Sequence, residues 1–304
     1  MKFSVLINNY NYAPFLPEAL ASVVCQNSPP AETLVVDDGS TDESAQVAGE
    51  LATRQPGVTL ITKENGGQLS AIRTGIEAAA GDWCAFLDAD DTWLPDHLSS
   101  AARAIHHHPE IDVHYSCHRE TAGPPRFRSK WPHGVMGPCG ALALATGCRV
   151  GTITSTIVIR TTLAKKISAA LAGLEGDWRT RADDCLLFAA AIFGARFHHD
   201  AAATVRYRIH ENNHFAGTET QEPPEYTARK SRMLEHLANL AGIHCDTRAH
   251  QLVIESKSPD NLRHARIRRR FFRAISNEPA IPWTTKSTCL IRALIPWHRV
   301  SRHR

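Results

Sequence analysis

The sequence has few cysteines, and none lie in the patterns of a disulfide scaffold or a zinc site. Eight cysteines are spread over 304 residues, and no two of them form a C-x-x-C pair. Small disulfide-bonded domains are much richer in cysteine, and structural zinc sites use closely spaced ligand pairs. We therefore expect free thiols, no structural zinc, and a protein stabilised by its hydrophobic core.

Long hydrophobic runs are also missing. The longest unbroken apolar run, residues 185–193, has nine residues, whereas a membrane-spanning helix needs about 20. Residues 1–7 lack the extended apolar region and small-residue cleavage site of a secretory signal. They are expected to form a first strand at residues 3–7, and the protein is expected to be cytoplasmic.

Positive charge is scarce in the body of the chain and concentrated at its C-terminal end. The formal net charge is only +3, but residues 261–304 contain 11 basic residues and one acidic residue, whereas residues 1–260 contain 23 basic and 30 acidic residues. This asymmetry argues against a nucleic-acid-binding protein and predicts an acidic body with a cationic C-terminal segment.

Short apolar strands alternate with helical patterns through the first 120 residues. This alternation is typical of βαβ units and predicts an α/β fold with a mostly parallel, Rossmann-like central sheet flanked by helices. An S-x-x-E capping box at residues 40–43 is expected to open the second helix. The expected strands are residues 3–7, 33–36, 58–62 and 83–87, and the expected helices are residues 15–24, 40–53 and 68–80.

The pattern is less regular after residue 120. A long loop is expected at 126–140, strands at 153–159 and 203–208, and helices near 161–172 and 183–193. From about residue 222 the periodicity is helical. The chain is therefore divided into an α/β domain, residues 1–220, and a helical, basic C-terminal extension, residues 221–304.

Two polar clusters follow the second and third strands. Asp37 and Asp38 end the second strand, where a carboxylate can accept a hydrogen bond from a nucleobase or a ribose; a plain turn explains them equally well. Asn65 and Gly66 precede a helix N-terminus, an arrangement able to hold an anion, although a simple turn uses the same residues. Arg73, two turns into that helix, could contact such an anion or lie on the surface.

Two acidic clusters lie further along the chain. Asp88 and Asp90 leave a buried strand and could share a divalent cation, which prefers oxygen ligands. A helix-start acidic cluster is the alternative. Asp184 heads an apolar helix, where it could complement the helix dipole or act as a general base. His210 could be a metal ligand or part of the site's wall. Because ligands bind at the carboxyl ends of parallel strands, these clusters are expected to converge on one site.

Four ordered motifs resemble those of the inverting glycosyltransferase family 2, which has the GT-A fold. They are SVLINNYN at residues 4–11, VVDDGSTD at 35–42, NGG at 65–67 and FLDADD at 86–91. The resemblance covers about residues 3–215. It implies transfer of a sugar with inversion, from a nucleotide-diphosphate sugar to an acceptor hydroxyl on a glycan or lipid-linked sugar, in cell-surface polysaccharide or glycoconjugate synthesis. It also implies a Mg²⁺ or Mn²⁺ ion.

The resemblance also implies roles for individual residues. Asp184 would be the catalytic base, Asp90 and His210 would meet the metal, Asp37 the nucleobase, and Asp88 the ribose or donor sugar. The full implied donor set is Asn9, Tyr10, Asp37, Asp38, Asn65, Gly66, Arg73, Asp88 and Ala89.

The sequence departs from the family pattern at several places. Asn8 stands where the family often has Pro, Thr74 where it often has Asn, and Asp183 where it often has Glu. The Arg usually found one to two turns after the base is replaced by alanines at 189–191. This absence supports the alternative of a catalytically degenerate nucleotide-sugar-binding or scaffold protein, whereas the intact set of Asp37, Asp88, Asp90 and Asp184 weighs against it. A dinucleotide oxidoreductase is disfavoured because no G-x-G-x-x-G motif follows any strand.

Aromatic side chains are few, at 7% of the chain, and two groups of them bear on function. Trp178 could stack on a sugar ring, although a core or surface role is the more ordinary one. Phe271, Phe272, Trp283 and Trp297 accompany the arginines of the extension. This composition suits peripheral contact with the inner face of the membrane, while a solvated helix or a subunit contact explains it equally well.

Overall fold

The computed structural model describes residues 1–121, 131–211, 224–278, 281 and 283–287. The expected boundary at 220/221 lies outside these described residues, as does Trp297 in the segment 288–304. Within them, no helix is both long and apolar enough to cross a membrane. The expectation of free thiols is confirmed for the described cysteines, which are Cys25, Cys84, Cys117, Cys139, Cys148 and Cys185.

The described residues form a nine-stranded mixed sheet in the order β3-β2-β1-β4-β8-β6-β9-β5, with β7 paired to β9. The N-terminal half is parallel, since β1 pairs in parallel with β2 and β4, and β2 with β3. The strands are β1 (Phe3–Asn9), β2 (Glu32–Asp37), β3 (Val58–Thr62), β4 (Trp83–Asp88), β5 (Thr92–Trp93), β6 (Val113–Glu120), β7 (Gly134–Met136), β8 (Ile157–Arg160) and β9 (Phe197–Tyr207).

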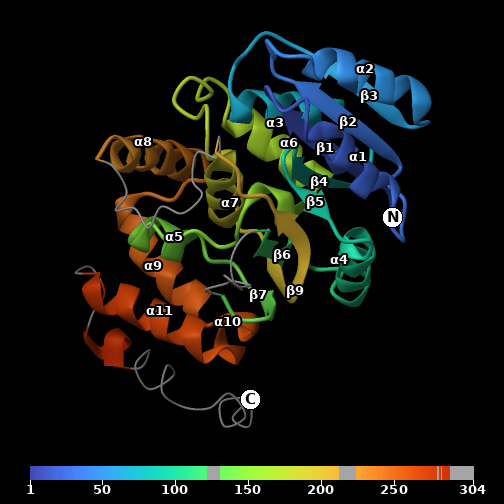
Figure 1. Cartoon of the computed structure of the whole chain (residues 1–304). Coiled ribbons are helices and arrows are strands. Elements are labelled where there is room, and N and C mark those ends of the chain that lie inside the picture. Colours follow the sequence, from blue (N-terminus) through green and yellow to red (C-terminus); the bar gives the residue numbers. More distant parts are fainter. Residues whose placement is uncertain (122–130, 212–223, 279–280, 282, 288–304) are drawn as a thin grey trace.

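Helices cover both faces of this sheet (Figure 1). Helices α1, α2 and α4 pack on one face, and α3, α6 and α7 on the other. The helices are α1 (Leu16–Val24), α2 (Ser44–Arg54), α3 (Gln68–Ala78), α4 (His97–His107), α5 (Gly140–Thr146), α6 (Thr161–Ala170), α7 (Ala182–Ile192), α8 (Pro224–Leu240), α9 (Cys245–Ser256), α10 (Pro259–Arg263) and α11 (Ala265–Asn277), with a 3₁₀ turn, η1 (Thr154–Thr156).

The two-sided cover explains why β1 and β4 carry apolar residues on both faces before their polar carboxyl ends. Successive strand residues point to opposite faces, so Leu6 and Phe86 enter the core under α3, whereas Val5 and Leu87 enter the core under α1. All four side chains are buried. A strand buried on both faces is expected to be apolar at successive positions, as Val5–Ile7 of β1 and Trp83–Leu87 of β4 are.

Helix α7 is the buried centre of the second half of the chain. Every residue from Asp184 to Ile192 is buried, as expected for a helix that is apolar on all sides. It contacts α5, α6 and α8, so the base candidate at its N-terminus is held from several directions. Of the C-terminal helices, α8 packs on α7, and α9 and α11 pack on α5 (Figure 1).

Several local expectations were wrong. The capping box at residues 40–43 does not open a helix: α2 begins at Ser44, and Ser40 bonds to Asp37 instead. The strand expected at 153–159 is a 3₁₀ turn followed by β8. Strand β9 begins at Phe197 rather than at 203. The expected loop at 126–140 contains β7, and β6 was not anticipated.

Candidate active site

Strand register brings the sequence clusters together. Asn8 of β1 lies beside Asp88 of β4, and Asn9 lies beside Asp37 of β2. These strand ends open into a cavity of about 980 Å³. Seven of the predicted residues line it: Asn9, Tyr10, Asp38, Asn65, Asp88, Asp90 and Asp184. Five do not, namely Asp37, Gly66, Arg73, Ala89 and His210.

Asp37 supports the cavity wall from behind. Its carboxylate is buried and accepts hydrogen bonds from Asn9 Nδ2 at 2.7 Å, and from Ser40 N at 3.0 Å and Oγ at 2.7 Å. The expectation that Asp37 meets the nucleobase is not supported by this placement. Asn9 lies in front of it, and its Oδ1 is a buried acceptor with no hydrogen-bond partner among the described residues. An acceptor left unsatisfied in a cavity is suited to a ligand N–H group.

Asp38 fills the expected anion cradle. Its Oδ1 accepts from Gly66 N at 3.0 Å and from Lys63 Nζ at 2.7 Å, and its Oδ2 accepts from Gly67 N at 2.6 Å. The backbone N–H groups of Gly66 and Gly67, an arrangement that was considered able to hold an anion, are therefore occupied by a side chain of the protein. Gly67 has φ +88, and a Cβ there would lie 2.5 Å from Arg179 Cα, so this turn requires glycine.

Three aspartates crowd the end of β4. Asp88 accepts hydrogen bonds from Asn8 Nδ2 at 2.9 Å and Gln68 Nε2 at 3.0 Å. Asp91 accepts from Ser155 Oγ at 2.5 Å. Burial, followed by the charge of Asp90, raises the pKa of Asp88 to about 7 and also raises the pKa of Asp91. These carboxyl groups therefore resist ionising side by side, and a bound cation would favour their charged forms.

His210 lies against this cluster. Its Nε2 is 3.1 Å from Asp90 Oδ2, and its ring packs on Phe15 and Tyr12 at centroid distances of 4.8 and 5.6 Å. Ala89, between the aspartates, is fully buried. Within the described residues no group of three His, Cys, Asp or Glu side chains could hold a metal ion. The carboxylate oxygen of Asp90 and the ring nitrogen of His210 are two adjacent groups that could serve as metal ligands.

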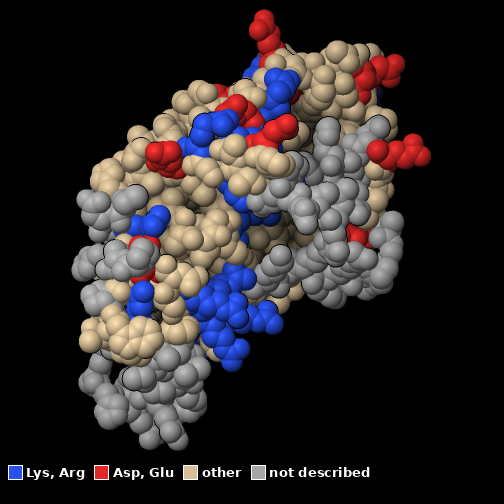
Figure 2. Space-filling view, turned by 90° about the vertical axis from the view of Figure 1, so that its left-hand side faces the viewer, with Lys and Arg blue, Asp and Glu red and all other residues tan. Residues whose placement is uncertain are grey.

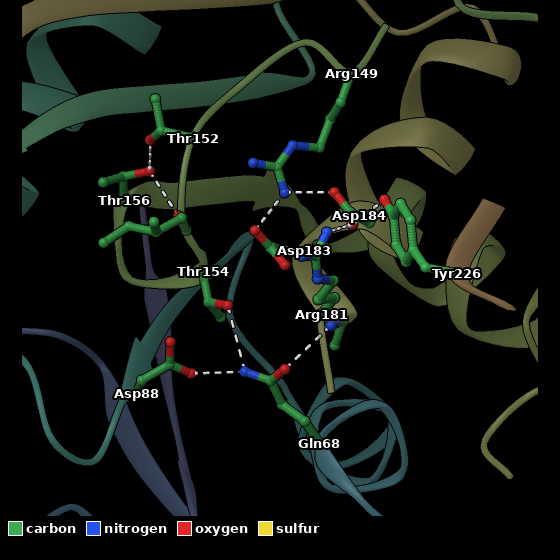
Figure 3. Close-up of polar contacts among 12 residues, drawn as sticks. Gln68, Asp88, Arg149, Thr152, Thr154, Thr156, Arg181, Asp183, Asp184 and Tyr226 are labelled. Carbon is green, nitrogen blue, oxygen red and sulfur yellow. Dashed lines mark hydrogen bonds and ion pairs between the residues drawn. The ribbon is translucent and has the colours of Figure 1, made fainter. Parts of the chain in front are cut away.

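Asp184 is held at the opposite wall, in the first turn of α7. Arg149 Nη1 donates to Asp184 Oδ1 at 2.6 Å and also pairs with Asp183, while the Tyr226 hydroxyl donates to Asp184 Oδ2 at 2.6 Å (Figure 3). Burial raises the pKa of Asp183, although Arg149 acts in the opposite direction. The two neighbouring carboxylates are thus bridged by one guanidinium.

Three arginines from segments other than α7 line the cavity, although α7 itself contributes none. The alanines at 189–191 of α7 are buried in the core, away from the cavity. Arg149, Arg179 and Arg181 line the cavity instead. Arg149 lies 35 residues before Asp184 in a segment without a recognisable motif, so no local spacing could have identified it.

Gln68 connects the two walls and was also missed as a site residue. Its Nε2 donates to Asp88, and its Oε1 accepts from the backbone N–H of Ala182 at 3.1 Å, the first residue of α7 (Figure 3). The sequence feature that could have identified Gln68 as a site residue is its position directly after the Asn-Gly-Gly turn. The side chain fixes the acidic end of β4 relative to the helix that carries Asp184.

Two further predicted residues have structural roles. Arg73 Nε donates to the carbonyl of Ser168 at 2.9 Å, and its guanidinium pairs with Glu175, so it ties α3 to α6 and the following turn. The expected donor contact of Arg73 is therefore not supported. Trp178 is 1% exposed and packs against Tyr226, which excludes sugar stacking by its ring.

Comparison with known proteins identifies the family. The family model described as Glycosyl transferase family 2 matches residues 4–162. The chain belongs to this family. It is 32% identical over 239 residues to the uncharacterized glycosyltransferase alr2836 of Nostoc sp., covering 74% of this chain and 70% of that protein. As a family member the protein is a glycosyltransferase, and inversion is consistent with that family.

Other relatives match over shorter lengths. The succinoglycan biosynthesis protein ExoW of Rhizobium meliloti is 40% identical over 111 residues, which cover 34% of each chain. ExoW and six further glycosyltransferase relatives are each matched over about a third or less of their own length. One relative of this glycosyltransferase, ExoW, is thus a protein of succinoglycan biosynthesis.

Solved structures confirm the GT-A fold. TarS residues 1–349 of S. aureus, in complex with UDP-GlcNAc, is 19% identical with a TM-score of 0.59, over 96% of this chain and 87% of that one. The mannosyltransferase PcManGT of Pyrobaculum calidifontis, in complex with GDP-Man and Mn²⁺, is 20% identical with a TM-score of 0.50, over 96% and 85%.

Proposed function

We propose that this glycosyltransferase uses Asp184 as the general base in transfer of a sugar from a nucleotide-diphosphate sugar to an acceptor hydroxyl. The observation that carries the proposal is that one cavity contains both Asp184 and the aspartates that end β4. Asp184 takes the proton of the acceptor hydroxyl, whose oxygen bonds to the anomeric carbon. The bond from that carbon to the diphosphate oxygen breaks, with inversion.

The nucleoside end of the donor is assigned to the β1–β2 side of the cavity. Asn9 Oδ1 is the buried acceptor there and suits a nucleobase N–H. Tyr10, 44% exposed at the same edge, offers a ring on which a base can stack. Asp37 would act indirectly, by accepting a hydrogen bond that orients Asn9. Asp38 and Asn65 would shape the turn at residues 65–67 that borders the cavity.

A divalent cation fits the other end of the donor. Asp90 and His210 would hold it, and a bound Mg²⁺ or Mn²⁺ would neutralise charge on the departing diphosphate. The donor chemistry supports this, because such ions are commonly bound by one or two protein groups together with phosphate oxygens and water. The raised pKa of Asp88, caused by burial and by Asp90, also favours a neutralising ion nearby.

Calorimetric titration tests donor and metal binding. UDP, GDP and their sugars are titrated with and without Mn²⁺ into the wild type and Asp90→Ala. We expect metal-dependent binding that is lost in Asp90→Ala. Binding that is unchanged by Mn²⁺ and by the substitution would contradict the metal assignment.

A second experiment separates catalysis from the scaffold alternative. We expect Asp184→Asn to bind the donor as the wild type does but to release no nucleoside diphosphate. Retained release in Asp184→Asn would refute the base assignment. A wild type that binds donors but turns over none, with any acceptor glycan or lipid-linked sugar supplied, would favour a nucleotide-sugar-binding scaffold.

The basic C-terminal extension bears on where transfer occurs. The apolar stripe of α11, including Ile267, Phe271 and Ile275, is buried in the protein core, so insertion of this helix into a membrane is not supported. Arg266, Arg269 and Arg273 occupy its exposed face. Figure 2 shows basic side chains gathered in the lower half of the face that contains the C-terminal helices.

For this surface we propose electrostatic contact with an anionic membrane. Each exposed basic residue near such a surface contributes about 1 kcal/mol. The triple variant Arg266→Gln, Arg269→Gln and Arg273→Gln is therefore expected to reduce sedimentation with phosphatidylglycerol vesicles. A charge-matched control changes Arg54, Arg103 and Lys165, which are exposed on other helices. Equal sedimentation of both variants would dispose of this proposal and favour a solvated helix or a subunit contact.

A further inference from the structure

The C-terminal extension reaches the active site through Tyr226. This residue lies in the first turn of α8, 42 residues after Asp184, and its hydroxyl donates to Asp184 Oδ2 at 2.6 Å. The tyrosine is 6% exposed. The contact is therefore a short hydrogen bond to a carboxylate, sheltered from solvent, between two regions that the sequence separates widely. Hydrogen bonds of this charge-assisted kind are among the strongest in proteins.

The ring of Tyr226 is fixed by neighbours on two sides. Trp178 packs edge-on against it at a centroid distance of 5.9 Å. The guanidinium of Arg181 lies 4.4 Å from the ring centroid, and Arg229 and Lys230 of α8 lie 5.3 and 5.0 Å away. These contacts hold the aromatic ring independently of the hydroxyl. Removing the hydroxyl alone therefore leaves the packing of α8 on α7 in place.

The carboxylate of Asp184 is held from both of its oxygens. Arg149 donates to Oδ1 and Tyr226 donates to Oδ2, so rotation of the carboxylate would break one bond or the other (Figure 3). A carboxylate can accept about four hydrogen bonds. Lone pairs consequently remain for an acceptor hydroxyl, and the two donors determine the direction in which they point.

We propose that Tyr226 is a positioning residue for the base Asp184, and that α8 thereby completes the active site. The inference rests on the proposed role of Asp184. The phenol fixes the orientation of the carboxylate toward the acceptor and stabilises its ionised form. The C-terminal extension is then part of the transfer machinery, in addition to any role it has at a membrane.

The substitution Tyr226→Phe tests this through rate and pH dependence. Loss of a hydrogen bond to the charged form makes a carboxylate hold its proton more readily. We expect kcat at neutral pH to fall about 10- to 100-fold, because a misdirected base should lose only part of the roughly 10²- to 10⁴-fold that general base catalysis contributes. The acidic limb of the kcat–pH profile should move to higher pH, with donor KM within about twofold of wild type. The other charged groups near Asp184 are Arg149, Arg181 and its neighbour Asp183. On α8, Arg229 and Lys230 lie over the ring of Tyr226.

The assay measures release of nucleoside diphosphate with Mn²⁺ and water as acceptor. The donors are UDP-glucose, UDP-galactose, UDP-N-acetylglucosamine and GDP-mannose, and the kinetics use the donor that the wild type hydrolyses fastest. Tyr115→Phe is the matched control, because Tyr115 is a buried tyrosine of β6 outside the cavity lining. It should keep the wild-type kcat and pH profile.

The outcomes separate this inference from the function it rests on. If Asp184→Asn is inactive but Tyr226→Phe has the wild-type rate and profile, the inference is overturned and the base assignment stands. An equal loss of rate at every pH, or a large rise in KM, indicates a purely structural role and also overturns it. Retained activity in Asp184→Asn overturns both.

A measurement without turnover checks the contact itself. Tyr226→Phe should lower the urea unfolding midpoint of the wild type, but it should leave that of Asp184→Ala nearly unchanged because the partner is already gone. Equal shifts in both backgrounds would show that the two side chains are not coupled, and would overturn the inference. Tyr115→Phe should shift the midpoint equally in both backgrounds.

Discussion

Arg149 binds the carboxylate of Asp184 at 2.6 Å and that of Asp183 with the same guanidinium nitrogen. Burial acts to lower the pKa of Arg149, but the two carboxylates outweigh it and raise that pKa. Two neighbouring acids would otherwise repel each other in a poorly hydrated site. The arginine thus supplies positive charge directly beside the two carboxylates.

Replacement of Arg149 should damage both stability and turnover. Arg149→Gln leaves two carboxylates facing each other without their cation, and removing one partner of a largely buried ion pair costs about 3 kcal/mol. We expect the free energy of unfolding to fall by about that amount and kcat to fall more than tenfold. Urea unfolding and nucleoside diphosphate release measure the two effects.

The control for Arg149 is an exposed ion pair. Arg232 pairs with Asp177 at 3.1 Å, with both side chains more than half exposed. Arg232→Gln should therefore change stability by less than about 1 kcal/mol. If Arg149→Gln were as mild as Arg232→Gln, the bridging role of Arg149 would be wrong.

Gln68 should affect turnover more than stability. Gln68→Ala removes the bridge between Asp88 and the first residue of α7, two hydrogen bonds worth about 1 kcal/mol each. We expect kcat to fall at least tenfold because the donor and base walls lose their fixed relation. Gln46→Ala, which removes an exposed hydrogen bond to Glu50, serves as the control and should leave kcat unchanged. A kcat equal to wild type in Gln68→Ala would rule out the bridge as a catalytic requirement.

Asn9 should affect nucleotide affinity. Asn9→Ala removes the unsatisfied acceptor in the cavity wall, and one net hydrogen bond is worth about 1 kcal/mol. We expect the Kd of the preferred nucleoside diphosphate to rise about 5- to 10-fold, with kcat at saturation little changed. Calorimetry against Asn277→Ala, an exposed asparagine of α11, measures this. An unaltered Kd would indicate that the nucleobase binds elsewhere in the cavity and does not contact Asn9.

Buried histidines should make the protein sensitive to acid. Burial lowers the pKa of His97 and of His114 to about 3 and that of His198 to about 4. Their unfolded pKa is about 6.5, so below that pH the unfolded chain binds protons that the folded chain does not. The stabilising effect of these neutral rings is present above pH 6.5 and is lost as the pH falls toward 4.

Comparison of urea unfolding at pH 7.5 and 5.5 tests this acid sensitivity. We expect the free energy of unfolding to be lower at pH 5.5 than at pH 7.5. In His97→Gln this decrease should be about 1 kcal/mol smaller than in the wild type. The exposed His106 provides the control, since His106→Gln should keep the wild-type pH dependence. An identical pH dependence in His97→Gln would contradict the neutral, buried state of that ring.

The N-terminal half of the fold was predictable because its signals are local. The strands β1–β4 are apolar runs between helical periods, and parallel strands joined by such helices leave their carboxyl ends at one edge. That rule alone placed Asp38, Asp88 and Asp90 in one site, whereas Asn9 was implied by the resemblance to the family. The second half was less predictable. Strand β6 reads VHYSCHRE, and its first six residues are buried although several are polar. Their polar groups pair with β9, as in the 3.1 Å contact of His114 with His198 and the 2.8 Å hydrogen bond from Thr204 Oγ1 to Ser116 Oγ.

The sequence by itself determined the family, the parallel core and the carboxylates at the cavity, because short motifs at strand ends are specified by neighbouring residues. Only the tertiary structure decided which groups surround those carboxylates. Arg149 and Tyr226 reach Asp184 from 35 and 42 residues away, and Asp37 turns out to act behind Asn9. Such partners depend on how distant segments pack, and no spacing in the sequence records that packing.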